Sequence, residues 1–150
     1  MQLKSIMDGL ARDADISPNT ASFWHYISIC AYLAEWSDSK TLETGAMSGA
    51  ILETFVVTEI LKSYWHNGKS APLYYYRDKD TKEIDLLIVS GQTIYPIEIK
   101  KTSSPNTDHI KNFYTLKKLN KKIGHGAVIC LTDTFMPINK TVSAIPVSFL

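Results

Sequence analysis

The chain has 150 residues, a formal net charge of +1, 45% hydrophobic residues and 21% charged residues. This length allows one domain with a hydrophobic core, and the composition is ordinary for a globular protein. No apolar run approaches the roughly 20 residues of a membrane-spanning helix, and the N-terminal segment lacks the apolar stretch of a secretory signal. Cys30 and Cys130 have no partners at metal-ligand spacing. We therefore expect a reduced cytoplasmic protein without membrane contact.

Residues 1–43 predict a short helical extension followed by a linker. Two helices are expected within residues 5–29, and Ser17-Pro18 provides a cap and a first-turn proline for the second. The string LARDADISPNTASFWHYI resembles a helix-turn-helix, whose second helix would enter a major groove. A helical hairpin used only for packing is the alternative, and the single arginine of the segment, Arg12, favours it.

Residues 44–150 predict an α/β domain with a mixed sheet. A strongly apolar helix is expected over residues 50–66, because Asn67-Gly68 follows it as a helix-ending signal. The other expected elements are a strand at 73–77, a hairpin of strands 84–89 and 93–100 with a tight turn at 90–92, a basic helix at 108–122, a buried strand at 127–131 and a last strand at 142–150. Pro146 predicts an edge position for the last strand. This order of helix, hairpin strands, helix and strand is typical of α/β domains.

Three polar side chains are expected to meet on the hairpin. Strand alternation places Glu98 and Lys100 on one face, and the turn near Gly91 brings the strand of Asp85 alongside them. Both segments lie far from the turn, so the three side chains share one end of the hairpin. Glu98 is flanked by isoleucines, and a buried carboxylate is costly unless it is paired or bound to a cation.

Glu53 is expected to join this site from the helix. Its i+3 and i+4 neighbours are Val56 and Val57, which places it at the end of an apolar stripe facing the sheet. The same helical spacing predicts that Glu59, beside Lys62, faces water.

Carboxylates with one lysine are the groups that metal-assisted phosphodiester hydrolysis needs. Carboxylates hold Mg²⁺ or Mn²⁺ with water left in the coordination shell, and the metal lowers the pKa of bound water. A lysine can orient or deprotonate that water, or offset charge in the transition state. A structural Glu–Lys pair with a capping Asp is the alternative, and the spacing alone does not decide between them.

Residues 100–122 form a basic stretch, with seven lysines and a single acid, Asp108. A basic stretch beside an acidic site is suited to holding a polyanion such as DNA. The candidate phosphate contacts are Lys101, Lys111, Lys117 and Lys118. A lysine-rich solvated helix face is the alternative.

The string Asp85…Ile97-Glu98-Ile99-Lys100 resembles the PD-(D/E)XK nuclease signature of restriction-endonuclease-like folds. Glu53 matches the acidic residue of the first core helix of that fold. More narrowly, residues 44–150 resemble the uncharacterised C-terminal domain of a prokaryotic AAA-type ATP-binding protein family, through GAMSGAILETFVVTEILKSYWHNG, LYYYRDKDTKEIDLLI, YPIEIKKTSSP and GAVICL. The segment ARDADISPNTASFW resembles the winged-helix region that precedes this domain, here truncated.

The resemblance implies a DNA-associated endonuclease-like domain of a larger ATPase. It places Asp85, Glu98 and Lys100 at the catalytic positions and Glu53, Asp85 and Glu98 at the metal positions. No Gly-x-x-x-x-Gly-Lys-Ser/Thr occurs in the sequence, so no ATPase activity is expected from this chain. The alternative function is a non-catalytic DNA- or protein-binding module, since a fold does not fix an activity. A third interpretation is assembly, in which the apolar N-terminal helices form a homodimer.

Overall fold

The computed structural model describes residues 48–150. The chain divides into two compact units, Met1–Phe55 and Val56–Leu150, and the second carries the sheet. Helix α4 (Ser48–His66) crosses from one unit to the other. The expected N-terminal helices, the helix-turn-helix segment and the linker lie outside the described residues.

Helix α4 confirms the apolar helix expected over residues 50–66, including its C-terminal signal. Gly68 has a φ of 65°, a left-handed conformation that glycine adopts without steric cost. Its N–H donates to the Trp65 carbonyl at 2.9 Å, and the Lys69 N–H donates to the Tyr64 carbonyl at 3.0 Å. These two bonds form a Schellman motif, which satisfies carbonyls that the last turn leaves without helical partners.

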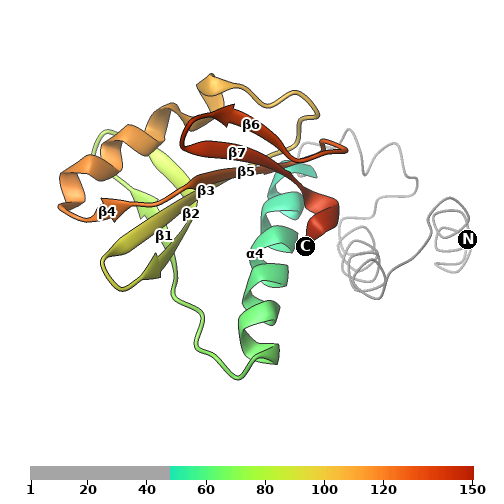
Figure 1. The fold of residues 1–150 in the computed structure, drawn as a ribbon, viewed down its shortest axis with the longest axis horizontal. Helices are drawn as coiled ribbons and strands as arrows, with labels where there is room; N and C mark the ends of the chain where they lie inside the picture. Colours follow the sequence, from blue (N-terminus) through green and yellow to red (C-terminus); the bar gives the residue numbers. More distant parts are fainter. Residues whose placement is uncertain (1–47) are drawn as a thin grey trace, which may run out of the picture. The chain divides into compact units, whose positions relative to one another are not determined.

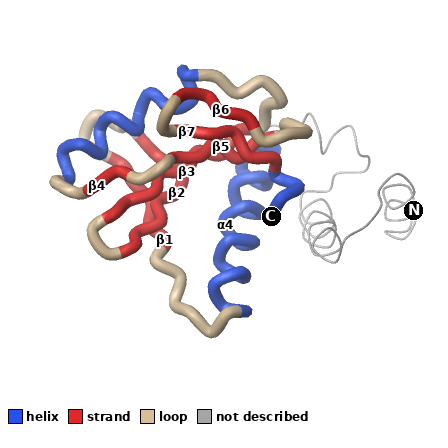
Figure 2. The backbone as a smooth tube through the Cα atoms, in the orientation of Figure 1, coloured by secondary structure: helices blue, strands red, loops and turns tan. Residues whose placement is uncertain are grey.

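The strands form one mixed sheet (Figures 1 and 2). The seven strands are β1 (Leu73–Arg77), β2 (Glu83–Ser90), β3 (Thr93–Lys100), β4 (Lys122–Ile123), β5 (Gly126–Cys130), β6 (Met136–Asn139) and β7 (Val142–Pro146). Their spatial order is β1-β2-β3-β5-β7-β6, and β4 pairs with β3 beside β5. Strands β1, β2 and β3 are antiparallel, β3, β5 and β7 are parallel, and β6 is antiparallel to β7. The mixed α/β architecture expected from the sequence is thus confirmed.

The 3₁₀ helix η1 (Thr107–Leu119) connects β3 with the following strands. Asn106 caps it: its side chain accepts from the Asp108 N–H at 2.9 Å, and its own N–H donates to Nδ1 of His109 at 3.0 Å. The basic helix expected at 108–122 is therefore real but shorter. It ends before Asn120, whose φ of 50° turns the chain, and Lys122 enters β4 to pair with Thr93.

Helix η1 covers one face of the sheet, where its Ile110, Phe113 and Leu116 join the buried cluster. The apolar cluster beneath η1 draws on the helix and on β2, β3, β5 and β7; it contains Ile84, Leu87, Ile94, Ile110, Phe113, Leu116, Val128, Cys130, Val142 and Ala144. Cys130 is a buried thiol of this cluster.

The edge position predicted from Pro146 is wrong. Strand β7 lies between β5 and β6, and Pro146 is its last residue, where the chain leaves for the short 3₁₀ turn η2 (Val147–Phe149). The actual edge strand on this side is β6, which the sequence did not predict. A proline is tolerated inside the sheet at a strand end, because little of the ladder continues beyond it.

No helix within residues 48–150 has the length and apolar content needed to cross a membrane.

Candidate acidic site

A β-bulge in β2 sets the position of Asp85. Strand β1 pairs Tyr74 with Leu87 and Tyr76 with Ile84, so one residue of β1 opposes two residues of β2, Asp85 and Leu86. The regular pairing of β2 with β3 begins only at Leu86. The bulge takes Asp85 out of simple strand alternation, as such bulges do next to functional sites. The Asp85 Oδ2 atom accepts the Ile99 N–H at 2.7 Å, which ties its carboxylate to β3.

Glu98 and Lys100 occupy the last residues of β3, on the face covered by η1. Their neighbours across the parallel ladder are Val128 and Cys130, and both belong to the cluster beneath η1. Lys100 lies level with the ends of β5 and β7, since Cys130 in turn pairs with Pro146. The site therefore lies at the carboxyl ends of the parallel strands, where α/β sheets commonly bind ligands.

Lys100 holds both carboxylates together. Its Nζ atom is 2.8 Å from Oε1 of Glu98 and 3.4 Å from Oδ2 of Asp85. The side chains of Glu98, Asp85 and Lys100 are 7%, 17% and 34% exposed, respectively. Glu98 is thus the most buried member of the cluster, and Lys100 is the most exposed.

Burial and charge shift the ionisation of this cluster. Burial raises the pKa of Glu98, and the negative charge of Asp85 raises it further, while Lys100 opposes these effects without cancelling them. Burial alone would lower the pKa of Lys100, but its hydrogen bond to Glu98 and the charges of both carboxylates outweigh burial, and the pKa is raised. Lys100 is therefore a firmly charged ammonium group at neutral pH.

The donor atoms fit a hard divalent cation. The Oε2 atom of Glu98 is buried and has no hydrogen-bond partner, so Glu98 can give one oxygen to a cation while Oε1 stays with Lys100. Mg²⁺ is usually held by one or two carboxylates, with water and substrate oxygens completing its shell. Asp85 and Glu98 supply this set. Among residues 48–150 there is no group of three or more His, Cys, Asp or Glu side chains arranged to hold a metal.

Helix α4 presents its two glutamates in the opposite way from the expectation. Glu53 is exposed, whereas the Glu59 side chain is only 9% exposed and pairs with Lys62. The buried stripe runs through Leu52 and Val56, and Glu59 falls on it three residues after Val56. The expectation that Glu53 is turned away from water is therefore wrong. Its role as a metal ligand remains a prediction, because Glu53 belongs to the Met1–Phe55 unit.

All four candidate phosphate contacts are exposed: Lys101, Lys111, Lys117 and Lys118. Lys101 follows the acidic cluster directly, and Lys111 lies in the first half of η1, the half that follows β3. A 3₁₀ helix rises about 2 Å per residue, so Lys117 lies roughly 12 Å further along the helix than Lys111. The lysines form a basic stripe along η1, and they do not gather at the carboxylates.

Sequence reasoning found the three clustered residues but missed what holds them. The bulge at Asp85 and the Ile99 N–H that binds its carboxylate both depend on strand pairing, which leaves no local signal. Asn112 of η1 adds another support, because its Nδ2 atom donates to the Glu83 carbonyl at 3.0 Å, two residues before Asp85.

The fold and the site together define a mixed α/β domain with a carboxylate–lysine cluster at the carboxyl ends of its parallel strands. Residues 48–150 match the family described as "Domain of unknown function (DUF4143)", and the chain belongs to this family.

Two curated relatives are similar to the chain: the uncharacterised proteins Mb2031c of Mycobacterium bovis and Rv2008c of Mycobacterium tuberculosis. Each is 28% identical over 109 residues, which is 73% of this chain and 23% of the relative. The chain therefore spans about a quarter of the length of the curated relatives it matches. No solved structure matches the chain.

Proposed function

We propose that the domain is a PD-(D/E)XK-like nuclease that hydrolyses phosphodiester bonds of DNA with Mg²⁺ or Mn²⁺. The observation that carries the proposal is the buried Oε2 atom of Glu98, which lacks a protein partner beside a second carboxylate and a charged lysine. An unpaired buried carboxylate oxygen costs folding free energy, and a bound cation would satisfy it.

Each residue of the cluster then has one task. Glu98 and Asp85 hold the cation, and the Ile99 N–H keeps the Asp85 carboxylate aimed at β3. A bound Mg²⁺ or Mn²⁺ would polarise the phosphate and lower the pKa of a coordinated water. Lys100 places a positive charge where negative charge develops on the phosphate oxygens. Its raised pKa favours this electrostatic role over the role of a base.

The basic stripe along η1 supports a polyanionic substrate. Lys111, Lys117 and Lys118 are exposed on the helix that covers the face of Glu98 and Lys100. Lysines at successive positions along a helix can neutralise phosphates without reading bases, which gives salt-dependent and sequence-independent affinity.

The test is a cleavage assay on supercoiled plasmid, linear duplex and single-stranded DNA, with Mg²⁺, with Mn²⁺ and with EDTA. Metal-dependent cutting that is lost in both Asp85→Asn and Lys100→Met supports the proposal. Cutting that survives in both variants belongs to a contaminant and contradicts it.

A DNA-binding module without catalysis is the second candidate. It is favoured by the fact that Lys100 already pairs with both carboxylates, so the cluster is largely neutralised by the protein itself. In this case DNA affinity should fall steeply with salt, and no substrate should be cut.

A further inference from the structure

Three segments at the amino ends of the parallel strands carry basic side chains and no acidic residue. They are the β2–β3 turn at residues 91–92, the stretch 121–126 that runs through β4 into β5, and the β6–β7 turn at residues 140–141. Their basic side chains are all exposed; we call this group the amino-end cations, and its members are Lys121, Lys122, His125 and Lys140. None of them forms an ion pair with another residue of the range 48–150.

Backbone hydrogen bonds join the three segments. The Lys122 N–H donates to the Gln92 carbonyl at 3.0 Å, which ties the middle stretch to the β2–β3 turn. The Gly126 N–H donates to the Thr141 carbonyl at 2.8 Å, which ties the same stretch to the β6–β7 turn. The amino-end cations are therefore held together at one end of the sheet.

The acidic residues of the sheet and its connections lie towards the opposite end. They occupy the start of β2, the end of β3 and the segments that adjoin the carboxyl ends of the parallel strands: Asp78, Asp80, Glu83, Asp85, Glu98, Asp108 and Asp133. The sheet is thus polarised in charge along its strands. Because the amino-end cations have no acid beside them on their own segments, they repel one another and attract anions.

A hollow of about 330 Å³ lies among these segments. Strand alternation places its wall on β3 on the sheet face away from Ile94 and the cluster beneath η1. No residue of the lining is fully buried, and none is acidic; the lining consists of Thr93, Tyr95, Lys122, Ile123, Gly124, His125 and Thr141. The hollow therefore offers two basic groups and several hydroxyl groups on accessible surface.

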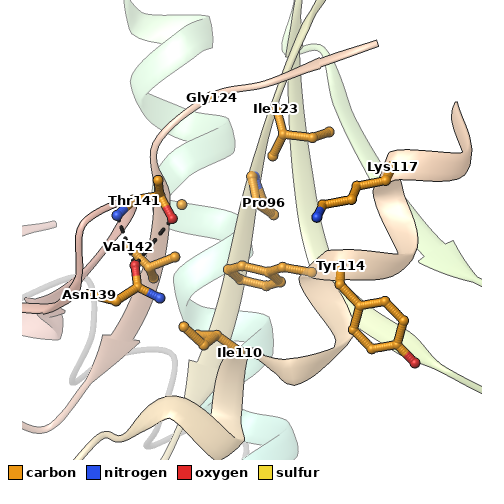
Figure 3. A pocket seen from close by; sticks show the side chains of 11 residues that line it. Pro96, Ile110, Tyr114, Lys117, Ile123, Gly124, Asn139, Thr141 and Val142 are labelled. Atoms are coloured by element: carbon orange, nitrogen blue, oxygen red, sulfur yellow. Dashed lines mark hydrogen bonds between the residues drawn. The ribbon is translucent and has the colours of Figure 1, made fainter. Parts of the chain in front are cut away.

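A larger pocket beneath η1, of about 420 Å³, adjoins the hollow (Figure 3). The two share Ile123, Gly124 and Thr141. The pocket beneath η1 is walled by core side chains such as Phe113 and Val142, which are buried and leave little surface for a ligand. The hollow, with its exposed cations, is the better candidate for a binding site.

Two contacts fix the walls of the hollow. The Tyr95 ring lies against the backbone of Gly124, where a Cβ atom would overlap it. The Nε2 atom of His125 is 2.8 Å from Oγ of the buried Ser143, so the imidazole is held in place and Nδ1 is the ring nitrogen left for an occupant. Groups that are positioned before binding lose less conformational freedom when a ligand arrives.

We propose that the hollow and the amino-end cations around it bind phosphate groups of a nucleic-acid backbone. Lys122 attracts a phosphate as a point charge, and His125 donates to the same phosphate through Nδ1. Cations spread over three segments exceed what one small anion neutralises, which favours a polymer of phosphates over free phosphate. The inference goes beyond the proposed function, because the site lies at the opposite end of β3 from Glu98 and requires neither metal nor cleavage.

Binding is measured in EDTA by the fluorescence anisotropy of a labelled oligonucleotide, as a single strand and as a duplex, over a range of salt concentrations. Lys122→Gln and His125→Gln test the hollow. Lys79→Gln and His66→Gln are matched controls, because they replace exposed residues of the same types that lie outside the hollow, in the β1–β2 turn and at the end of α4. Equal urea midpoints establish that the variants are folded.

We expect Lys122→Gln and His125→Gln each to weaken binding of both oligonucleotide forms about three- to tenfold, and the controls to weaken it less than about twofold. Lys122→Gln should also reduce the slope of log affinity against log salt by about one, because one phosphate contact is lost. Single strand and duplex should respond alike, since phosphate contacts do not read bases.

Equal losses in the variants and their controls would overturn the hollow and leave only general charge attraction. Inorganic phosphate and poly-glutamate are tested as competitors. Displacement of the oligonucleotide by either one, at the same concentration of negative charge as an unlabelled oligonucleotide, would overturn the nucleic acid as the occupant.

The two proposals fail separately. Binding that depends on Lys122 and His125, without any metal-dependent cleavage, refutes the nuclease and keeps the hollow. Metal-dependent cleavage by a protein whose DNA affinity is indifferent to Lys122→Gln and His125→Gln keeps the nuclease and refutes the hollow.

Discussion

Replacing Glu98 with glutamine should stabilise the metal-free protein at neutral pH. The pKa of Glu98 is raised, chiefly by burial, which means that folding favours the neutral carboxyl over the carboxylate. Each unit of such a rise corresponds to about 1.4 kcal/mol lost when the group ionises in the folded state. Glutamine keeps the shape, stays neutral, and can still accept from Lys100. We expect a gain on the order of 1 kcal/mol at pH 8, because Lys100 keeps Asp85 as a charged partner.

The gain should depend on pH with a definite sign. The pKa of Glu98 in the folded protein lies above its ordinary value of 4.5. The neutral carboxyl therefore contributes fully to the stability of the wild type below pH 4.5, and this contribution is lost as the pH rises through the pKa of the folded state. Wild type and Glu98→Gln should therefore be equally stable near pH 4 and diverge towards pH 8. The ammonium group of Lys100 stays charged across this range, so it adds no slope of its own.

The assay is urea unfolding in EDTA at pH 4 and pH 8, with the variant read against wild type at each pH. Glu83→Gln is the control, because Glu83 lies on β2, is 44% exposed and pairs with Arg77 at the surface, where such pairs contribute little. A loss of more than about 1 kcal/mol in Glu98→Gln at pH 8 would show that the charged Glu98 stabilises the fold. It would mean that the Glu98–Lys100 pair is a structural ion pair.

Three further predictions follow from the same contacts. Mg²⁺ or Mn²⁺ should raise the melting temperature of the wild type, because a ligand that binds only the folded state stabilises it. A thermal-shift assay should show no rise for Glu98→Gln, and an equal rise in both proteins would mean that the metal binds elsewhere. Lys100→Met should lower the free energy of unfolding at pH 8 by about 2–3 kcal/mol, because it leaves the Glu98 carboxylate without its lysine. Urea unfolding should show a smaller loss at pH 4, and a loss that does not depend on pH would contradict the pairing of Lys100 with Glu98. Gly126→Ala should lower the free energy of unfolding by about 1–3 kcal/mol, because the added methyl group would clash with Phe113. Gly49→Ala, in open space on α4, should be neutral or stabilising. Equal effects of the two substitutions in urea unfolding would contradict the packing at Gly126.

The hairpin and its chemistry could be predicted because their signals are local. Alternation along Thr93–Lys100 places Glu98 and Lys100 on one face, and Gly91, with a φ of 58°, supplies the turn that pairs β2 with β3. A charged residue between isoleucines is visible in one sequence, and so is the conclusion that it is buried and needs a partner. The structure confirms that burial and supplies Lys100 as the partner.

The remaining features depend on tertiary contacts that a single sequence does not display. The bulge at Asp85 arises from a shift in the register between β1 and β2. The sequence of β1 contains no residue pattern that predicts this shift. Strand β6 is a short run that includes a proline, and its pairing with β7 decides its conformation. The two glutamates of α4 lie about 120° apart around the helix axis, and a stripe that counted Val57 beside Val56 placed the wrong one inside.

The acidic cluster is tested by the rate of Mn²⁺-dependent DNA cleavage of Glu98→Gln, measured beside that of Glu59→Gln. The two glutamates are matched, because their side chains are 7% and 9% exposed and each pairs with a lysine. Only Glu98 has a second carboxylate at the same lysine. We predict that Glu98→Gln abolishes cleavage and that Glu59→Gln cuts DNA at the wild-type rate. Cleavage that persists in Glu98→Gln, or that both substitutions reduce alike, would contradict the assignment of the acidic cluster as the active site.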